Sequence, residues 1–304
     1  MNDLVTDVKS LELETLKNLK SSKAANTLRA YKADFRDFTL FCQQNGLNSM
    51  PSEPKIITLY LTHLSKSSKF STLKRRLASI SVIHKLNGHY LDTKHPIITE
   101  NLLGIRRVKG TYQKAKKPIL INDLKLIVNA INQDNNPKKK IEKKALLLVG
   151  FAGGFRRSEL VSVEYQDMEF VNEGVKIFVK RSKTDQSGEG MTKGIPYFSN
   201  PEYCPVVSLK NWMKESGIKS GKVFDMSDKN VALIIKKYTA LAGLDQSKYS
   251  GHSLRSGFAT STAELGAEER SIMAMTGHKT TQMVRRYIKE ANLFKNNALN
   301  KIKI

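Results

Sequence analysis

The chain has 304 residues, 40% of them hydrophobic, which is enough for two folded domains with cores of their own. Its 51 Lys and Arg residues against 28 Asp and Glu leave a formal charge of +23. This excess predicts a polyanionic partner, although charge alone does not separate DNA from RNA or from an anionic membrane, and a biased genome is the alternative explanation. Two cysteines exclude a disulfide framework and lack the paired spacing of a zinc site. The apolar stretch around residues 145–155 is too short to span a membrane and the N-terminus has no signal-peptide pattern, so we expect a cytoplasmic protein with no membrane partner.

The first hundred or so residues predict an all-helical domain. Apolar residues recur at steps of three and four from Thr27, a candidate N-cap, until Asn45 and Gly46 stop the pattern. A second helix is expected from the region 51–54, and a third from Ser71 and Thr72. The positions expected to face the core are Leu28, Tyr31, Phe35, Phe38 and Phe41, then Ile57, Tyr60, Leu61 and Leu64, then Leu77, Ile80, Ile83 and Leu86.

Three cations, Lys74, Arg75 and Arg76, stand in the first turns of the third helix. The helix macrodipole disfavours positive charge at a helix N-terminus unless an anion lies nearby. We therefore predict phosphate contact here, with a solvated helix face as the alternative.

A basic, polar stretch without helical or strand periodicity follows Arg106 and Arg107 and ends at Pro118. We predict an interdomain linker over residues 109–118, which its charge would keep extended along a phosphate backbone. The two domains could then lie on opposite sides of a duplex. A plain flexible tether is the alternative.

Beyond the linker the sequence predicts helices that flank a small antiparallel sheet. Helices are expected over 121–132 and 141–150, and the second of them runs into Gly153 and Gly154. Strands are expected over 168–171, 175–179 and 194–198, because residues 172–174 carry a hairpin signal. Helices resume over 206–213, 231–241, 254–265 and 280–288. The fold class predicted is mainly α with a small antiparallel β-sheet in the second domain.

The second half of the chain supplies the residue types that phosphodiester cleavage by a protein nucleophile requires. Such a reaction needs cations on the non-bridging oxygens, a proton donor for the leaving oxygen and an activated nucleophile in line. Arginine, lysine or histidine, and tyrosine meet these needs in turn. Two-metal nuclease chemistry is less favoured, because the acidic pair Asp225 and Asp228 lacks a third partner that the sequence can reveal.

The spacing of these residues resembles the catalytic motifs of the tyrosine recombinases, the phage integrase family. The motifs are Gly-Phe-Arg-Arg-Ser-Glu-Leu at 154–160, Arg-Ser-Lys-Thr-Asp-Gln at 181–186, Gly-His-Ser-Leu-Arg at 251–255, Thr-Gly-His at 276–278, and Tyr287. Segments at 26–35, 51–54 and 71–77 are similar to the core-binding domain of Cre-like and Xer-like members. The resemblance therefore covers nearly the whole chain.

The resemblance implies that Arg156 and Arg255 clamp the scissile phosphate and that Glu159 supports the site from below. Arg157 is then a variable neighbour, interpreted as a surface cation. Lys183 matches the hairpin lysine that acts as general acid for the 5′ oxygen, although Lys180, Arg181 and Lys193 are nearby cations and a solvated hairpin would look similar.

The histidines and the tyrosine complete the implied site. His252 precedes Arg255 by one helical turn and would face the same phosphate. His278 could hydrogen-bond a non-bridging oxygen, and Tyr287, nine residues later, is the implied nucleophile. An ordinary tyrosine on an amphipathic helix would instead pack in the core.

The resemblance also implies a two-domain DNA clamp with no metal or nucleotide cofactor. A helical, SAM-like core-binding domain would span 1–108 and contact DNA through Lys74, Arg75, Arg76, Arg106 and Arg107. The catalytic domain would span 119–304 and end in an apolar tail over 293–304 that docks on a neighbouring copy. The chain would be a monomer or weak dimer when free and a homotetramer on double-stranded DNA with an inverted-repeat core site. A type IB topoisomerase and a DNA-binding protein with a decayed site are the alternatives.

Overall fold

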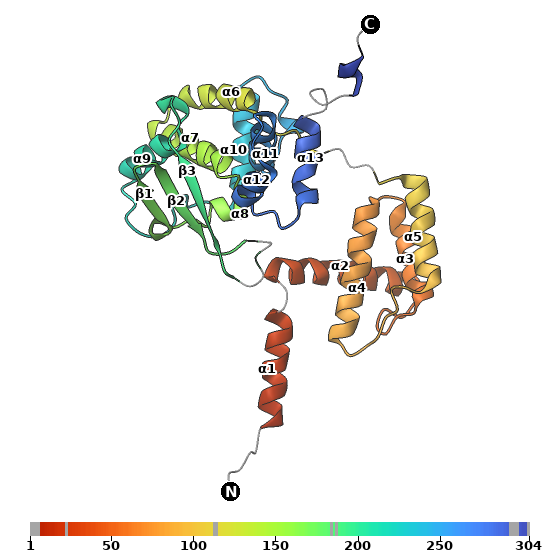
Figure 1. Cartoon of the computed structure of the whole chain (residues 1–304). Coiled ribbons are helices and arrows are strands. Elements are labelled where there is room, and N and C mark those ends of the chain that lie inside the picture. Colours follow the sequence, from red (N-terminus) through yellow and green to blue (C-terminus); the bar gives the residue numbers. More distant parts are fainter. Residues whose placement is uncertain are drawn as a thin grey trace. The chain divides into compact units, whose positions relative to one another are not determined.

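The computed structural model describes residues 7–21, 24–111, 115–182, 185, 188–291 and 298–302. The chain divides into two compact units, Met1–Lys114 and Ala115–Ile304, called the first and second unit below (Figure 1). The division falls inside the segment 109–118, which the sequence predicts to be a linker. The first unit is helical, and the second combines helices with one three-stranded antiparallel sheet. The predicted fold class is confirmed. None of the described helices is long and apolar enough to cross a membrane.

The helices of the first unit are α1 (Val8–Ser21), α2 (Ala25–Gln44), α3 (Pro54–Ser65), α4 (Phe70–Leu86) and α5 (Pro96–Lys109). Helices α2 to α5 enclose a core that includes Phe38, Ile57, Tyr60, Leu73, Ile80 and Ile98. The prediction of Thr27 as N-cap is wrong, because the Ala24 carbonyl already accepts the amide of Thr27. Leu86 was expected in the core and is 39% exposed at the end of α4.

The sheet of the second unit has the order β1 (Met168–Val171), β2 (Gly174–Val179) and β3 (Met191–Pro196). Register pairs Met168 with Ile177, and Val175 with Ile195. The third strand lies a few residues before its predicted position at 194–198, because β3 pairs with β2 from its first residue, Met191, opposite Val179. The sheet packs on α7 (Pro137–Ala152) and α9 (Pro205–Ser216) through one apolar cluster.

The remaining helices of the second unit carry or support the polar residues of the sequence motifs. They are α6 (Ile121–Asn132), α8 (Arg157–Leu160), α10 (Asp228–Leu241), α11 (Ser253–Glu264), α12 (Glu269–Thr276) and α13 (Thr281–Ala291). Short 3-10 turns occupy Tyr165–Asp167, Pro201–Tyr203, Gln246–Lys248 and Ala298–Lys301. Helix α12 was not predicted from the sequence; it has eight residues, which is too short to show a clear period.

The end of the predicted linker is fixed to the second unit. The Lys117 amide donates to the Lys248 carbonyl at 2.7 Å, and the Ile119 amide donates to the Ser253 carbonyl at 2.9 Å. A Cβ on Gly257 would lie 1.9 Å from the Ile119 carbonyl oxygen, so only glycine lets the chain pass this close to α11. The segment that enters the second unit therefore lies against the helix that carries Arg255.

Candidate active site

Arg156 is held by a buried carboxylate at the start of α8. Helix α7 ends at Ala152, and Gly154, with φ of 54°, turns the chain towards Arg156. Glu159 is 2% exposed and accepts both the Arg156 amide at 2.9 Å and its Nη1 at 2.6 Å. The carboxylate thus fixes the guanidinium, as the predicted supporting role of Glu159 requires.

Arg255 on α11 is the largest of the fully buried side chains in the described part of the molecule. Its Nη1 donates to the Gly154 carbonyl at 2.9 Å and its Nη2 contacts His278 Nε2 at 3.0 Å. Burial, followed by repulsion from Arg156, lowers its pKa to about 10, so it stays charged at neutral pH. Its Nε has no hydrogen-bond partner among the described residues, and an unpaired buried donor is costly.

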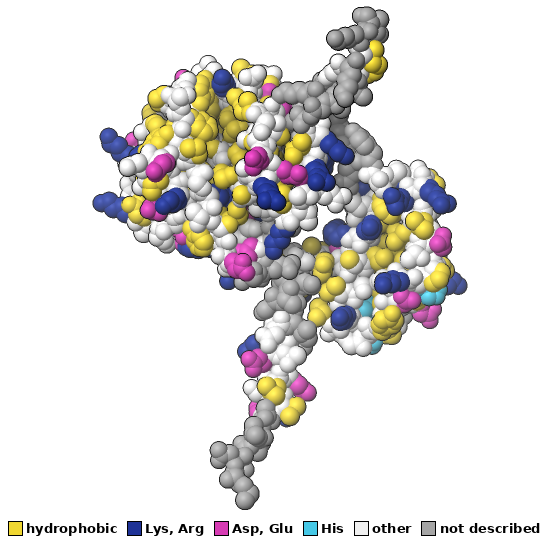
Figure 2. Space-filling view, viewed as in Figure 1, with side chains coloured by type: hydrophobic (Ala, Val, Ile, Leu, Met, Phe, Trp, Pro, Cys, Tyr) yellow, Lys and Arg dark blue, Asp and Glu magenta, His cyan; other side chains and the backbone are white. Residues whose placement is uncertain are grey.

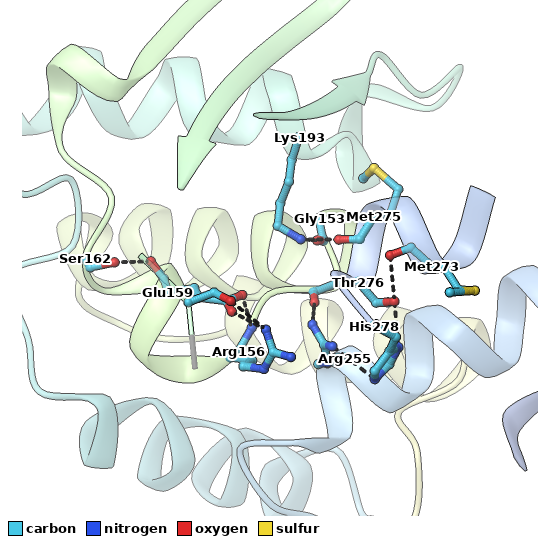
Figure 3. Close-up of polar contacts among 12 residues, drawn as sticks. Gly153, Arg156, Glu159, Ser162, Lys193, Arg255, Met273, Met275, Thr276 and His278 are labelled. Atoms are coloured by element: carbon cyan, nitrogen blue, oxygen red, sulfur yellow. Dashed lines mark hydrogen bonds and ion pairs between the residues drawn. The ribbon is translucent and has the colours of Figure 1, made fainter. Parts of the chain in front are cut away.

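His278 follows the left-handed turn at Gly277 that ends α12. It is 7% exposed, and its Nδ1 lies 2.7 Å from the Thr276 hydroxyl. Burial lowers the His278 pKa to about 4, and the charges of Arg255 and Arg156 add to the effect. Arg156, Arg255 and His278 lie side by side (Figure 3).

His252 and Tyr287 meet across two helices. His252 immediately precedes α11, and its Nε2 lies 3.3 Å from the Tyr287 hydroxyl on α13. Burial lowers the His252 pKa, with further lowering by Arg255 and Arg156, so the ring is neutral at neutral pH. The rings of His278 and Tyr287 have centroids 6.1 Å apart. Tyr287 also packs against the small apolar cluster around Val284, so its ring is both a core element and a neighbour of two histidines.

The structure therefore brings six of the candidate residues to one site in the second unit: Arg156, Glu159, His252, Arg255, His278 and Tyr287. Lys183 lies outside the described residues, between the end of β2 and the start of β3. Among the described residues no three His, Cys, Asp or Glu side chains gather closely enough to hold a metal ion.

The five candidate DNA-binding cations lie in the first unit and fall into two groups. Arg75 and Arg76 are both paired with Asp34, which is 3% exposed and also accepts the Ser79 hydroxyl at 2.7 Å. Their charge thus compensates a buried carboxylate inside the unit. Lys74, Arg106 and Arg107 are exposed.

The sequence did not predict that Lys193 is buried at the site. Lys193 was one of several cations near Lys183, but in the structure it is 0% exposed on β3 and bonded to backbone carbonyls. The available signal was its spacing: Lys193 and Ile195 stand two apart on one strand, so they share its inward face.

Arg157 also has a more specific place than the surface position expected for it. A Cβ on Gly251 would lie 1.9 Å from Arg157 Cδ, so the arginine stem occupies the space beside the turn that leads to His252. Its guanidinium lies 3.6 Å from the Asp228 carboxylate at the start of α10. No sequence spacing links positions 157 and 251, and only the fold reveals the contact.

Comparison with known proteins gives concordant results. The model of the phage integrase family matches residues 119–293. An "Integrase/recombinase xerD homolog" from Selenomonas ruminantium is 40% identical over 99% of this chain and 92% of its own length. A "Tyrosine recombinase XerC" from Syntrophus aciditrophicus is 24% identical over 84% of each.

Two solved structures share the fold. A lambda integrase (75-356) dimer bound to a COC' core site has a TM-score of 0.60 at 18% identity, covering 97% of this chain and 99% of that one. XerH site-specific recombinase bound to a palindromic difH substrate has a TM-score of 0.62 at 15% identity, covering 81% and 73%.

Proposed function

The chain belongs to the phage integrase family and is a site-specific tyrosine recombinase, and on that premise we propose that Tyr287 cleaves DNA through a 3′-phosphotyrosyl intermediate. The observation that carries the proposal is the 3.3 Å contact between the Tyr287 hydroxyl and His252 Nε2, beside two arginines. A phenol next to a neutral imidazole and a phosphate-binding pair has what nucleophilic attack requires.

In the proposed reaction the Tyr287 oxygen attacks phosphorus, and the bond from phosphorus to the 5′ oxygen breaks. His252 is the proposed acceptor of the phenolic proton, because its Nε2 faces the hydroxyl and its lowered pKa keeps the ring unprotonated. Lys183 donates a proton to the departing 5′ oxygen, a role that rests on the family resemblance. Attack by a partner's 5′ hydroxyl reverses each step and rejoins the strands.

Arg156 and Arg255 are the proposed clamp for the two non-bridging oxygens. Both are fixed before DNA binds, Arg156 by Glu159 and Arg255 by the Gly154 carbonyl. Donors fixed in advance stabilise developing charge without reorganisation, which makes them effective in a transition state.

Basic side chains of the first unit are the proposed contacts to the DNA backbone. Lys and Arg side chains are spread over its visible face (Figure 2). Lys74 and Arg106 line a cavity of about 630 Å³ at the start of α4, together with Lys69 and Lys109. We assign backbone contact to Lys74, Arg106 and the exposed Arg107, whereas Arg75 and Arg76 are also paired with Asp34.

The proposed assembly is a homotetramer on double-stranded DNA with an inverted-repeat core site. The palindromic substrate of XerH and the core-site complex of lambda integrase support this site type by analogy of fold. The proposed docking tail, 293–304, lies mostly outside the described residues, but Leu299 and Ile302 are 67% and 58% exposed. Deleting residues 294–304 should preserve single-site binding and abolish recombination.

A nicked suicide substrate tests the chemistry, because cleavage near a nick releases a short strand and traps the covalent product. Wild-type protein should become attached to the 3′ phosphate, and Tyr287→Phe should bind the same DNA without any adduct. Tyr165→Phe is the matched control, since Tyr165 is 42% exposed and outside the site. An adduct that persists in Tyr287→Phe would refute the assignment.

A further inference from the structure

The ammonium of Lys193 joins two helix ends. Its Nζ donates to the Gly153 carbonyl at 2.8 Å and also to the Met275 carbonyl. The third side of the ammonium faces the Phe155 ring, whose centroid is 4.9 Å away. Lys193 reaches from β3 to these carbonyls in Figure 3.

Both carbonyls stand shortly before a residue of the active site. Gly153 is the C-cap of α7 and precedes Arg156 by three residues. Met275 lies in the last turn of α12 and precedes His278 by three residues. Carbonyls at helix C-termini lack intrahelical partners and carry partial negative charge, so an ammonium is well matched to them. One side chain thus ties together the two turns that lead into the site.

Burying a lysine at this position costs desolvation free energy. Neighbouring Val175, Ile177 and Ile195 form an apolar sheet core that an aliphatic residue would extend at no desolvation cost. Burial lowers the Lys193 pKa to about 8; Glu159 opposes that shift, whereas Arg255 and Arg156 add to it. Three cations therefore lie near one another with Glu159 as the carboxylate among them, and a bound phosphate would reduce their repulsion.

We propose that Lys193 is a positioning residue of the recombination reaction: it fixes the end of α7 to the end of α12, so that Arg156 and Arg255, the second oriented by His278, bind one phosphate. This inference rests on the proposed function, because it acts through the phosphate clamp. Lys193 touches neither the nucleophile nor the leaving oxygen in this role.

The test compares Lys193→Met, which keeps the length of the side chain but removes its donors and charge, with Lys176→Met. Lys176 is the matched control because it lies on the adjacent strand β2, exposed and paired only with Glu169 among the contacts described. Covalent adduct formation is measured on saturating suicide DNA, and the rate is expressed per DNA-bound molecule. Because only DNA-bound molecules are counted, a smaller folded fraction of the variant does not lower the measured rate.

We expect Lys193→Met to slow adduct formation by roughly 10- to 100-fold, the scale of a small misplacement of catalytic groups, with the Kd for DNA within about twofold of wild type. Lys176→Met should match wild type in both. A wild-type rate for Lys193→Met, or a loss confined to DNA affinity, would overturn the proposal.

A substrate with sulfur in place of the bridging 5′ oxygen distinguishes two roles for Lys193. One is positioning of the phosphate-binding arginines, and the other is protonation of the leaving oxygen. A thiolate leaves without a proton donor, so a defect in general acid catalysis disappears on this substrate. The Lys193→Met defect should persist, because the clamp acts on the non-bridging oxygens; its disappearance would contradict the inference. Failure of the proposed function itself would show differently, as an adduct in Tyr287→Phe.

Discussion

Arg255 donates from Nη2 to His278 Nε2 across 3.0 Å, which assigns the tautomer of the histidine. Guanidinium has donors only, so Nε2 is the acceptor and the ring proton is on Nδ1. The Thr276 hydroxyl agrees with this, because it donates its one proton to the Ile272 carbonyl at 2.6 Å and must accept from His278 Nδ1. In this state His278 orients Arg255, and it has no N–H to offer a phosphate oxygen until Nε2 gains a proton.

Removing the Thr276 hydroxyl should weaken the site. Thr276→Val keeps the shape but leaves the buried Nδ1–H of His278 without an acceptor, at a cost of about 1–3 kcal/mol. Adduct formation should fall by roughly tenfold as His278 and Arg255 lose their fixed orientation. Thr276→Ser retains the hydroxyl and should stay near wild type in suicide-substrate assays; equal rates for Val and Ser would contradict this chain of contacts.

Acid should destabilise the second unit through His278. Its folded pKa of about 4 lies below the ordinary value near 6.5, so the folded state disfavours the proton. Neutral His278 therefore contributes fully to the stability of the folded state above about pH 6.5, and this contribution is lost as the pH falls towards 4. Between pH 7.5 and 5.0 this one group should remove about 2 kcal/mol from the free energy of unfolding.

Urea unfolding followed by the fluorescence of Trp212, the single tryptophan, measures this loss in the second unit. Other groups titrate in the same range, so the decisive quantity is the difference between wild type and His278→Gln. The variant should lose less stability over the same pH interval. Parallel pH profiles for the two proteins would show that His278 is not the source.

Neighbouring cations on α4 should separate into a structural and a DNA-binding role. Arg76→Ala deprives the buried Asp34 of a partner and should destabilise the first unit by about 1–3 kcal/mol, seen as faster hydrogen exchange in α2 and α4. Lys74→Ala should leave exchange unchanged. It should weaken binding to all DNA sequences and lower the slope of log K against log salt by about one. The reverse pattern would refute the division.

Gly251 and Arg157 should behave as a coupled pair. Gly251→Ala places a methyl group where Arg157 Cδ lies, so the arginine must move and the turn before His252 shifts. Adduct formation should fall, because His252 then leaves its position 3.3 Å from the Tyr287 hydroxyl. Adding Arg157→Ala removes the clash and should restore much of the rate. Additive losses in the double variant would show that the two residues are independent.

Local patterns predicted much of the molecule. The helix over 121–132 and the first strand were placed correctly, since turn residues and apolar periods mark them in the sequence. Helix α12 was missed because eight residues show little period, and β3 was displaced because its limits are set by pairing with β2. The interpretation of Arg75 and Arg76 as phosphate ligands could not anticipate Asp34, which lies some forty residues earlier in the sequence.

The sequence by itself determined the family, the chemistry and the order of the motif residues, because residue type and spacing are properties of the linear chain. Only the tertiary structure decided which groups touch. It brings His252 to Tyr287, gives His278 its tautomer through Arg255 and Thr276, and buries Lys193 between the ends of α7 and α12. Such contacts join residues up to 82 positions apart and depend on burial and on the direction of hydrogen bonds, which are properties of the packed fold.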